Sequence, residues 1–146
     1  TLFIDFQAFC PPEYVPQVLV DLLNFYKNTY KDPLMGSTEP MYWFLSFIAV
    51  EILIQLPFFF VACYGLLKDS KYIRLPLVVY GAHVSTTVLP TIVEVMLNPV
   101  HALDNKERWA LFGFYFPYFI LPLIMLIDSY IRIHQFISLS QKTKTQ

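Results

Sequence analysis

The hydrophobic residues of the chain gather in four blocks that are separated by polar stretches. Three of these blocks are long enough to form helices that cross a membrane, which takes roughly 20 apolar residues. Tyr42 and Trp43 open the first long block and Trp109 opens the last, where interfacial aromatic residues are typical. The three long blocks run over residues 41–67, 73–97 and 109–137.

The remaining block, residues 1–9, is stopped by Cys10 and two prolines, and is too short to span. We interpret it as the end of a transmembrane helix whose N-terminal part is missing. A mature N-terminus left by a cleaved signal peptide is the alternative. With this helix, residues 1–146 form one domain, an all-α integral membrane four-helix bundle.

The segment of residues 10–40 links the first two blocks and has helical periodicity over residues 16–32. Pro16 suits a first helical turn. This pattern predicts a short amphipathic helix at the membrane interface. A loop helix packed on the bundle is the alternative. The apolar face carries Leu19, Leu22, Leu23, Tyr26 and Tyr30.

Composition agrees with a membrane protein. Hydrophobic residues make up 56% of the 146 residues and charged residues 14%, whereas soluble domains carry about 25% charged residues. The net charge of −1 gives no indication of a nucleic-acid partner. Cys10 and Cys63 should approach opposite faces of the bilayer and lack metal-site spacing, so neither a disulfide, a metal nor a cofactor is predicted.

Basic residues predict the orientation. The linker of residues 68–74 and the tail of residues 138–146 are the more basic regions, which places both termini in the cytosol and residues 10–40 in the lumen. The chain ends in KTKTQ, so Lys142 and Lys144 have the spacing of a retrieval signal that a coat receptor reads. The sequence therefore predicts a multi-pass protein of the endoplasmic reticulum membrane.

Ionisable residues within the blocks are candidates for function, because charge is costly inside a bilayer. Asp5 and Glu51 are expected in one layer, where two carboxyl groups share a proton and leave one negative charge. Such a charge attracts an amine or polarises a hydroxyl. The other candidates are His83, Glu94 and Asp128. The alternative for His83 is a structural role, and the alternative for the two acids is that they lie near helix ends and reach the membrane interface.

Two pairs of polar residues share helix faces at a spacing of four, namely Glu51 with Gln55 and His83 with Thr87. Prolines within the blocks remove backbone hydrogen bonds and tend to kink helices. Several kinks around one polar layer leave room for a ligand, although kinked bundles also pack solid. These prolines are Pro57, Pro90, Pro117 and Pro122.

Five stretches together resemble the sigma-2 receptor type within the EXPERA family of four-helix membrane proteins, which also includes sterol Δ8-Δ7 isomerases. The matches occur in order over nearly the whole chain. Length and divergence are similar to those of the fungal members, the efficient mitochondria targeting-associated proteins. The stretches are FIDFQAF, KDPL, EILIQLPFF, IRLPLVVYGAHVSTTVLP and YFPYFILP.

The resemblance implies a lumen-side cavity that is reached through the bilayer. In the family, the residue matching Asp5 pairs with a ligand amine, and the residue matching Glu51 hydrogen-bonds to that aspartate. The residue matching Asp32 is expected to hold the lumenal loop. Pro57 and Pro117 are assigned structural roles. The expected ligand-binding residues are Asp5, Glu51, Gln55, Tyr118, Tyr115, Thr87, His83, Tyr26 and Ile48.

The expected function is non-enzymatic binding of a sterol, an oxysterol or a cationic amphiphile, with a role in sterol homeostasis or trafficking. One alternative is a sterol isomerase, which needs an acid and a base. However, the resemblance implies that isomerases of this family are longer and carry both a histidine and a glutamate on the second helix, whereas here that helix has Glu51 but no histidine. Another alternative is a membrane factor that assists mitochondrial precursor targeting or clearance. The resemblance also implies homodimers and membrane-protein partners for some members.

Overall fold

The computed structural model describes residue 7, residue 10 and residues 12–36 and 41–144, with side chains described as far as residue 141. The described part is helical and contains no strand, which confirms the all-α class. Short elements are the 3-10 turns η2 (Pro12–Tyr14), η4 (Lys71–Ile73) and η5 (Pro99–His101), and the π turn η3 (Glu51–Gln55). The α-helices are α2 (Gln17–Tyr30), α3 (Pro33–Gly36), α4 (Tyr42–Val50), α5 (Leu56–Leu67), α6 (Arg74–Leu97) and α7 (Asn105–Lys144).

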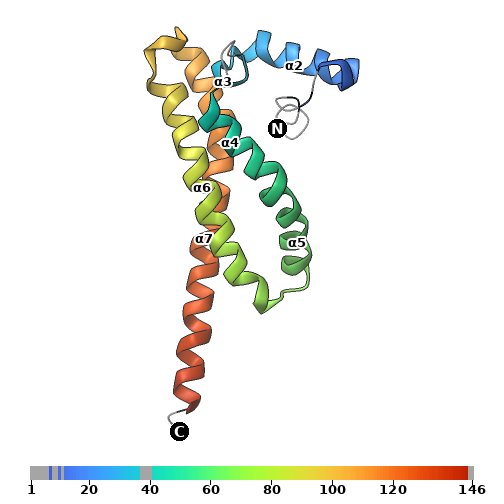
Figure 1. The fold of residues 1–146 in the computed structure, drawn as a ribbon. Coiled ribbons are helices and arrows are strands. Elements are labelled where there is room, and N and C mark those ends of the chain that lie inside the picture. Colours follow the sequence, from blue (N-terminus) through green and yellow to red (C-terminus); the bar gives the residue numbers. More distant parts are fainter. Residues whose placement is uncertain (1–6, 8–9, 11, 37–40, 145–146) are drawn as a thin grey trace.

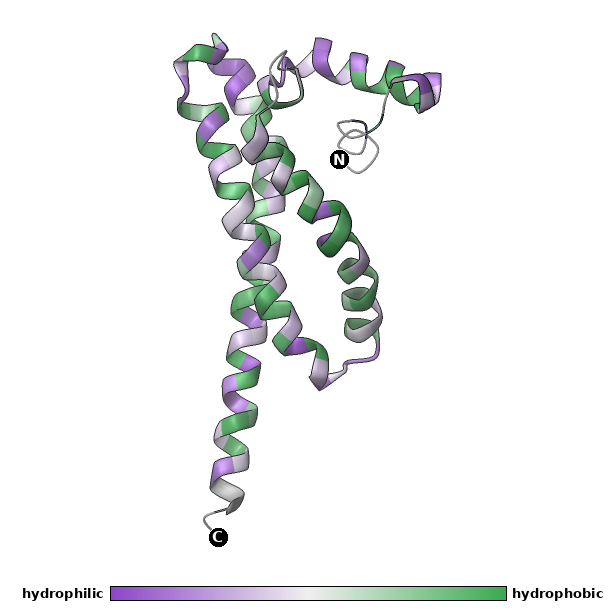
Figure 2. Ribbon diagram, in the orientation of Figure 1, coloured by the Kyte–Doolittle hydropathy of each residue, from purple (hydrophilic) through white to green (hydrophobic). Residues whose placement is uncertain are grey.

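Within the described residues, three helical stretches are long and apolar enough to cross a membrane. Figure 2 shows hydrophobic residues along most of their length. The predicted helix of residues 1–9, including Asp5, lies outside the described residues. The three stretches are Tyr42–Leu67, Lys71–Leu97 and Asn105–Gln141.

The helices form an open arrangement rather than a tight bundle (Figure 1). α6 and α7 run antiparallel, side by side, and form the most extensive helix pair. α4 and α5 make one bowed rod that meets this pair at its two ends, and α2 lies across one end of the molecule. The sequence predicted α2 as an amphipathic helix, and it forms with its Tyr26 and Tyr30 side on the bundle.

α6 and α7 approach closely at Gly81. A Cβ atom at this position would lie 2.5 Å from the Pro122 carbonyl oxygen and 2.8 Å from the Leu126 Cβ. Small residues at helix interfaces are the usual means by which membrane helices bring their backbones together. The glycine therefore sets the separation of the helix pair on which the rest of the fold is built.

α7 is longer than the sequence predicted. The predicted helix ended near residue 137 and was followed by a tail, whereas α7 begins at Asn105 and continues to Lys144. The prediction was wrong because it placed the end where hydrophobicity falls. After Pro122 the chain contains neither proline nor glycine, so nothing local stops the helix. The final segment extends beyond the other helices (Figure 1).

A π turn interrupts the rod of α4 and α5. The Leu56 N–H donates to the Glu51 carbonyl oxygen, five residues back, and Pro57 follows in the first turn of α5. Proline lacks an N–H and its ring presses on the preceding turn, so a widened turn accommodates it without breaking the rod. The kink that the sequence predicted at Pro57 takes this form, and the turn holds both Glu51 and Gln55.

Arg108 closes the end of α6 next to α2. Its guanidinium donates to the carbonyl oxygens of Val95 at 2.8 Å, Met96 at 2.7 Å and Asn98 at 2.9 Å. These carbonyls lie at the C-terminal end of the helix, where partners are otherwise lacking. Beside them, Glu94 accepts hydrogen bonds from Asn98 and His101. Glu94 therefore has polar partners at the helix end.

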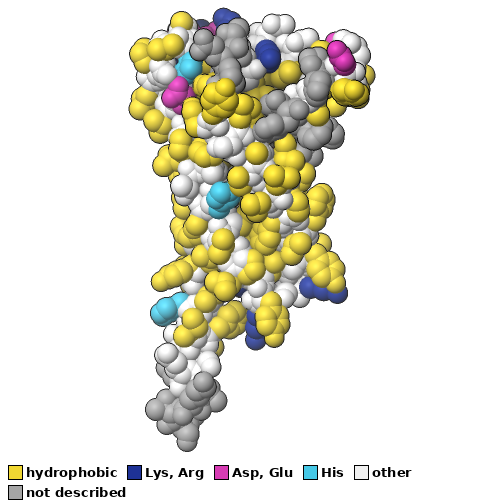
Figure 3. All heavy atoms as spheres, viewed as in Figure 1, with side chains coloured by type: hydrophobic (Ala, Val, Ile, Leu, Met, Phe, Trp, Pro, Cys, Tyr) yellow, Lys and Arg dark blue, Asp and Glu magenta, His cyan; other side chains and the backbone are white. Residues whose placement is uncertain are grey.

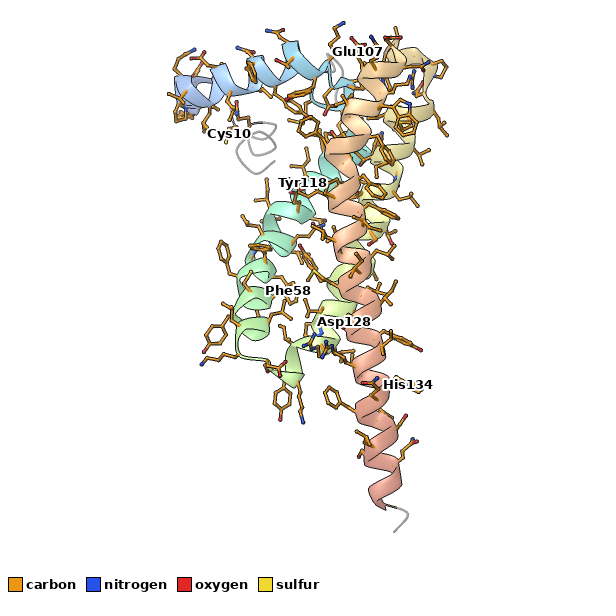
Figure 4. The ribbon with its side chains drawn as sticks, turned by 180° about the vertical axis from the view of Figure 1, so that it is seen from behind. Cys10, Phe58, Glu107, Tyr118, Asp128 and His134 are labelled. Carbon is orange, nitrogen blue, oxygen red and sulfur yellow. The ribbon has the colours of Figure 1, made fainter. Side chains whose placement is uncertain are left out.

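Asp128 lies in an ionic cluster at the opposite end of α6. It accepts from Arg74 at 3.1 Å and from Arg132 at 2.9 Å, and Arg74 also reaches Asp69 at 3.3 Å. Figure 4 labels Asp128 where α7 passes the first turn of α6. This cluster joins the α5–α6 turn to the middle of α7.

Candidate functional site

A cavity of about 330 Å³ lies between the α4–η3 segment on one side and α6 and α7 on the other. Tyr26 of α2 and Met35 of α3 complete its lining at one end. Its size is within the range of pockets that bind small organic molecules. The bowed shape of the α4–α5 rod thus leaves a partly open cavity, and the rod does not pack solidly against α6 and α7.

Most of the cavity wall is apolar or aromatic. α4 contributes Phe44, Phe47 and Ile48, and Ile48 is 2% exposed. The facing wall mixes apolar residues with hydroxyl groups. From α6 and α7 it includes Val84, Thr87, Val88, Thr91, Phe114, Tyr115 and Tyr118.

The π turn supplies the strongest polar groups of the cavity, Glu51 and Gln55. Gln55 is buried, and neither side chain has a hydrogen-bond partner among the residues that the structure describes. Buried polar groups normally have partners, and a carboxylate left without one is costly. Tyr118 faces the same space from α7, on the side toward α4 (Figure 4), and no hydrogen bond to its hydroxyl is made by the described residues. Together these side chains can receive the polar end of a guest molecule.

Asp32 organises the wall next to α2. It is 1% exposed and accepts hydrogen bonds from the hydroxyls of Tyr26 at 2.6 Å and Tyr115 at 2.5 Å, and from the Leu34 N–H at 2.9 Å. Both tyrosines line the cavity. Asp32 therefore fixes two side chains of the wall, one from α2 and one from α7, and ties the turn between α2 and α3 to the bundle.

A second link between the α2–α3 turn and α7 lies at the surface. Lys31 and Glu107 form an ion pair at 2.6 Å. Glu107 raises the pKa of Lys31 above its ordinary value, first through this hydrogen bond and then through its charge. Lys31 has a left-handed backbone with φ of 50° and ends α2 by donating its N–H to the Lys27 carbonyl. This backbone turn directs the chain from α2 toward Asp32.

The structure brings most of the expected binding residues into this one cavity. From four helical elements and the π turn, seven residues of the expected set form part of its lining. Asp5 lies outside the described residues, so its pairing with Glu51 stays a prediction. The seven are Glu51, Gln55, Tyr118, Tyr115, Thr87, Tyr26 and Ile48.

His83 is placed differently from the prediction and is not among the lining residues. The α6 residues that face the cavity are Val84, Thr87, Val88 and Thr91, and one residue step along a helix turns the side chain by about 100°. His83 therefore points about a quarter turn away from the cavity face. Its Nε2 is buried without a hydrogen-bond partner among the described residues.

The other predicted residues have defined positions. Pro57 opens α5 behind the π turn, and Pro117 lies inside α7 between Tyr115 and Tyr118 on an exposed part of the helix. Lys142 and Lys144 lie in the last turn of α7, with side chains outside the described set, so their role as a retrieval signal stays a prediction.

Apart from Ile48, the sequence did not single out the apolar part of the lining. Phe44, Phe47 and Ile48 precede Glu51 at spacings of seven, four and three, which is a helical face and thus a usable signal. Val84, Val88 and Thr91 follow the same rule on α6. Within uniformly apolar helices, however, this face is hard to tell from the lipid-facing one, because both are hydrophobic.

A family model described as EXPERA (EXPanded EBP superfamily) matches residues 18–129. This range contains all of the described cavity residues. The chain belongs to the EXPERA family. Within it, the similar proteins include receptors: Sigma intracellular receptor 2 of Xenopus tropicalis is 40% identical over 134 residues, which cover 87% of this chain and 77% of the relative.

Two further relatives show how far the sequence similarity extends, from a vertebrate to a yeast protein. Sigma intracellular receptor 2 of Homo sapiens is 38% identical over 137 residues, covering 87% of this chain and 77% of the relative. Efficient mitochondria targeting-associated protein 19 of Schizosaccharomyces pombe is 31% identical over 112 residues, covering 75% of this chain and 56% of the relative. The sequence resemblance to the sigma-2 receptor type of the family is thereby confirmed.

Proposed function

We propose that this EXPERA chain is a non-enzymatic membrane protein that binds one amphiphilic molecule, a sterol or a cationic amphiphile, in its helical cavity. The observation that carries the proposal is the arrangement of Glu51 and Gln55 on a mostly apolar wall without described hydrogen-bond partners. Such a wall favours the body of the guest, and the two polar groups favour a single polar end. The names of the receptor relatives support a binding role.

The polar end of the guest would lie at the π turn. Glu51 accepts from an amine or a hydroxyl, while the Gln55 amide offers both a donor and an acceptor. Tyr118 lines the cavity from α7, and its hydroxyl would complete this set. An amine gains most from a carboxylate in a poorly hydrated site, because a charge-assisted hydrogen bond is stronger there than in water.

Binding is favoured over isomerisation by the position of the histidine. Shifting a double bond in a sterol requires one group to protonate a carbon and another to remove a proton. Among the described lining residues, Glu51 is the carboxyl group, and His83 faces about a quarter turn away from the cavity. We expect purified protein to form no Δ7 product from a Δ8 sterol. Turnover that Glu51→Gln abolishes would overturn this choice.

The binding proposal is tested by extracting the purified protein and identifying bound lipids by mass spectrometry. We expect one class of amphiphile to be retained in near-stoichiometric amount. Ile48→Trp fills the cavity and should remove most of it, since Ile48 is 2% exposed and lines the space. Leu53→Trp is the matched control, because Leu53 is 74% exposed on the same rod. Equal lipid retention by the two variants would contradict the proposal.

A cationic amphiphile in a radioligand assay tests the polar end of the same site. Glu51→Gln keeps the shape of the side chain but removes the carboxylate, and we expect affinity to fall by about 10- to 100-fold, the effect of one charge-assisted bond. Asp5→Asn should act in the same direction if the two carboxyl groups form a pair. Unchanged affinity in both variants would show that the amine binds elsewhere.

We also propose that the protein resides in the endoplasmic reticulum membrane with both termini in the cytosol. Lys142 and Lys144 support this through their spacing from the chain end. Replacing both with serine should move the tagged full chain to later compartments in fluorescence microscopy. An unchanged location would remove the support that the tail gives to the proposal.

A further inference from the structure

The end of the molecule at the α5–α6 turn carries two lysines that the nearby acids leave unpaired. Asp69 and Asp128 are the carboxylates described there, and both bind Arg74, while Asp128 also binds Arg132. Neither Lys68 nor Lys71 is within ion-pair distance of a described carboxylate. Two ammonium groups are therefore available to an external anion.

Both lysines rest on aromatic rings. The Lys68 Nζ lies 4.6 Å from the centroid of the Tyr64 ring, and the Lys71 Nζ lies 5.1 Å from that of Phe136. A ring face attracts an ammonium group but satisfies none of its three N–H donors with an oxygen. The contacts thus hold the two cations in place while leaving their hydrogen-bonding capacity free.

Each of the two lysines has an exposed apolar residue next to it in the sequence. Leu67 is 88% exposed and Tyr72 is 92% exposed, directly before Lys68 and directly after Lys71. At the end of a membrane-spanning helix, such side chains favour the boundary between acyl chains and headgroups, and lysine stems extend from it toward the headgroups. In a bilayer, this arrangement would put the ammonium groups at the depth of lipid phosphates.

The opposite end of the molecule has another charge pattern. Figure 3 shows lysine and arginine gathered below the hydrophobic surface near the α5–α6 turn, whereas basic and acidic side chains occur together at the α2 end. There Lys31 is paired with Glu107, and Arg108 binds backbone carbonyls. The described acidic residues of the α2 end are Glu13, Asp21, Asp32, Glu94, Asp104 and Glu107.

We infer that Lys68 and Lys71 form a binding site for the headgroup of an anionic phospholipid at the α5–α6 end of the molecule. Arg132, with its side chain half exposed, borders the site from α7. A lipid is the favoured occupant because the bilayer presents phosphate oxygens at this depth around every copy of the protein. Unpaired lysines near an anionic membrane surface each contribute roughly fivefold to association.

The test uses the full chain reconstituted in phosphatidylcholine nanodiscs with trace spin-labelled phosphatidylserine or phosphatidylcholine, compared by electron paramagnetic resonance. We expect phosphatidylserine to associate on the order of tenfold more strongly, and the preference to weaken as ionic strength rises from about 0.1 to 1 M. Lys68→Gln combined with Lys71→Gln should abolish most of the preference. Lys27→Gln combined with Lys106→Gln, at the α2 end, should leave it intact.

Other outcomes are decisive as well. Lys68→Arg combined with Lys71→Arg keeps the charge and should keep the preference for phosphatidylserine. Loss of the preference in this variant would overturn the proposed site. Equal association of the two lipids with the unaltered protein would overturn it as well. If phosphatidylserine shows no preference but an acidic peptide binds the nanodisc in a manner that depends on both lysines, the site belongs to a protein partner and the lipid proposal fails.

Discussion

Replacing Asp32 with alanine is expected to lower the free energy of unfolding by about 3–5 kcal/mol and to abolish ligand binding in the cavity. The Asp32 carboxylate is buried and accepts three hydrogen bonds, from Tyr26, Tyr115 and the Leu34 N–H. Hydrogen bonds to a charged group contribute roughly 1.5–3 kcal/mol each, and removing the acceptor leaves three donors without a partner. The measurement is unfolding in mixed micelles, followed by tyrosine and tryptophan fluorescence.

Asp21→Ala is the matched control for this change. Asp21 lies on α2 and is exposed, with one hydrogen bond from Gln17 at 3.0 Å, so its loss should change stability by no more than about 0.5 kcal/mol. Tyr115→Phe separates the effect of the Tyr115–Asp32 hydrogen bond from a general disruption of the fold. In a double-mutant cycle, Asp32 and Tyr115 should show a coupling energy of about 1–3 kcal/mol. A coupling near zero would show that the hydroxyl contact does not stabilise the wall.

Gly81→Leu is expected to destabilise the protein by about 3 kcal/mol or to prevent folding. The first atom of the new side chain would lie 2.5 Å from the Pro122 carbonyl oxygen, which belongs to the backbone and cannot move aside alone. The α6–α7 pair would have to separate, and overpacking of this kind costs about 1–3 kcal/mol or more. Gly113→Leu supplies the comparison, because a Cβ at Gly113 meets nothing within 4 Å.

The two glycine variants should therefore differ in their effect on stability, with a loss for Gly81→Leu and no loss for Gly113→Leu. Gly113 lies in α7 and leucine is the better helix former by roughly 0.8 kcal/mol, so Gly113→Leu should leave stability unchanged or raise it slightly. Thermal unfolding in detergent, followed by size-exclusion chromatography of the heated samples, measures both. Equal losses in the two variants would mean that any change in helix hydrophobicity, rather than the close approach at Gly81, determines stability.

The sequence predicted the parts of the fold that depend on local composition. Long apolar runs located the three described spans, and the fourfold spacing of Glu51 and Gln55 placed both on one face. Seven of the expected residues line one cavity. For the polar ones on the spanning helices the reason is that a polar side chain in an apolar helix has few places to go other than the interior. Their binding role remains to be tested by the lipid and amine experiments.

Other features were beyond the sequence because they depend on tertiary contacts or on subtle backbone changes. The acceptor of the Tyr115 hydroxyl is Asp32, which is 83 residues away in the chain. No periodic pattern signals such a contact. The π turn before Pro57 was anticipated only as a kink. His83 was assigned to the binding face through its spacing of four from Thr87, but Thr87 lies at the edge of the lining face of α6, whose centre is near Val84.

The continuation of α7 beyond the rest of the molecule makes its last described turns a helical spacer. From Arg132, which is anchored to Asp128, to Lys144 the helix rises 12 residues, or about 18 Å at 1.5 Å per residue. If this end of the molecule lies in the cytosol as proposed, a factor that binds the last turn of α7 would meet it at a fixed distance from the bilayer and at a fixed angle around the helix axis. Inserting two residues into the helix would rotate its last turn by about 200° around the axis but lengthen it by only about 3 Å. Binding of such a factor should therefore depend on the rotation of the last turn more than on its distance from the bilayer.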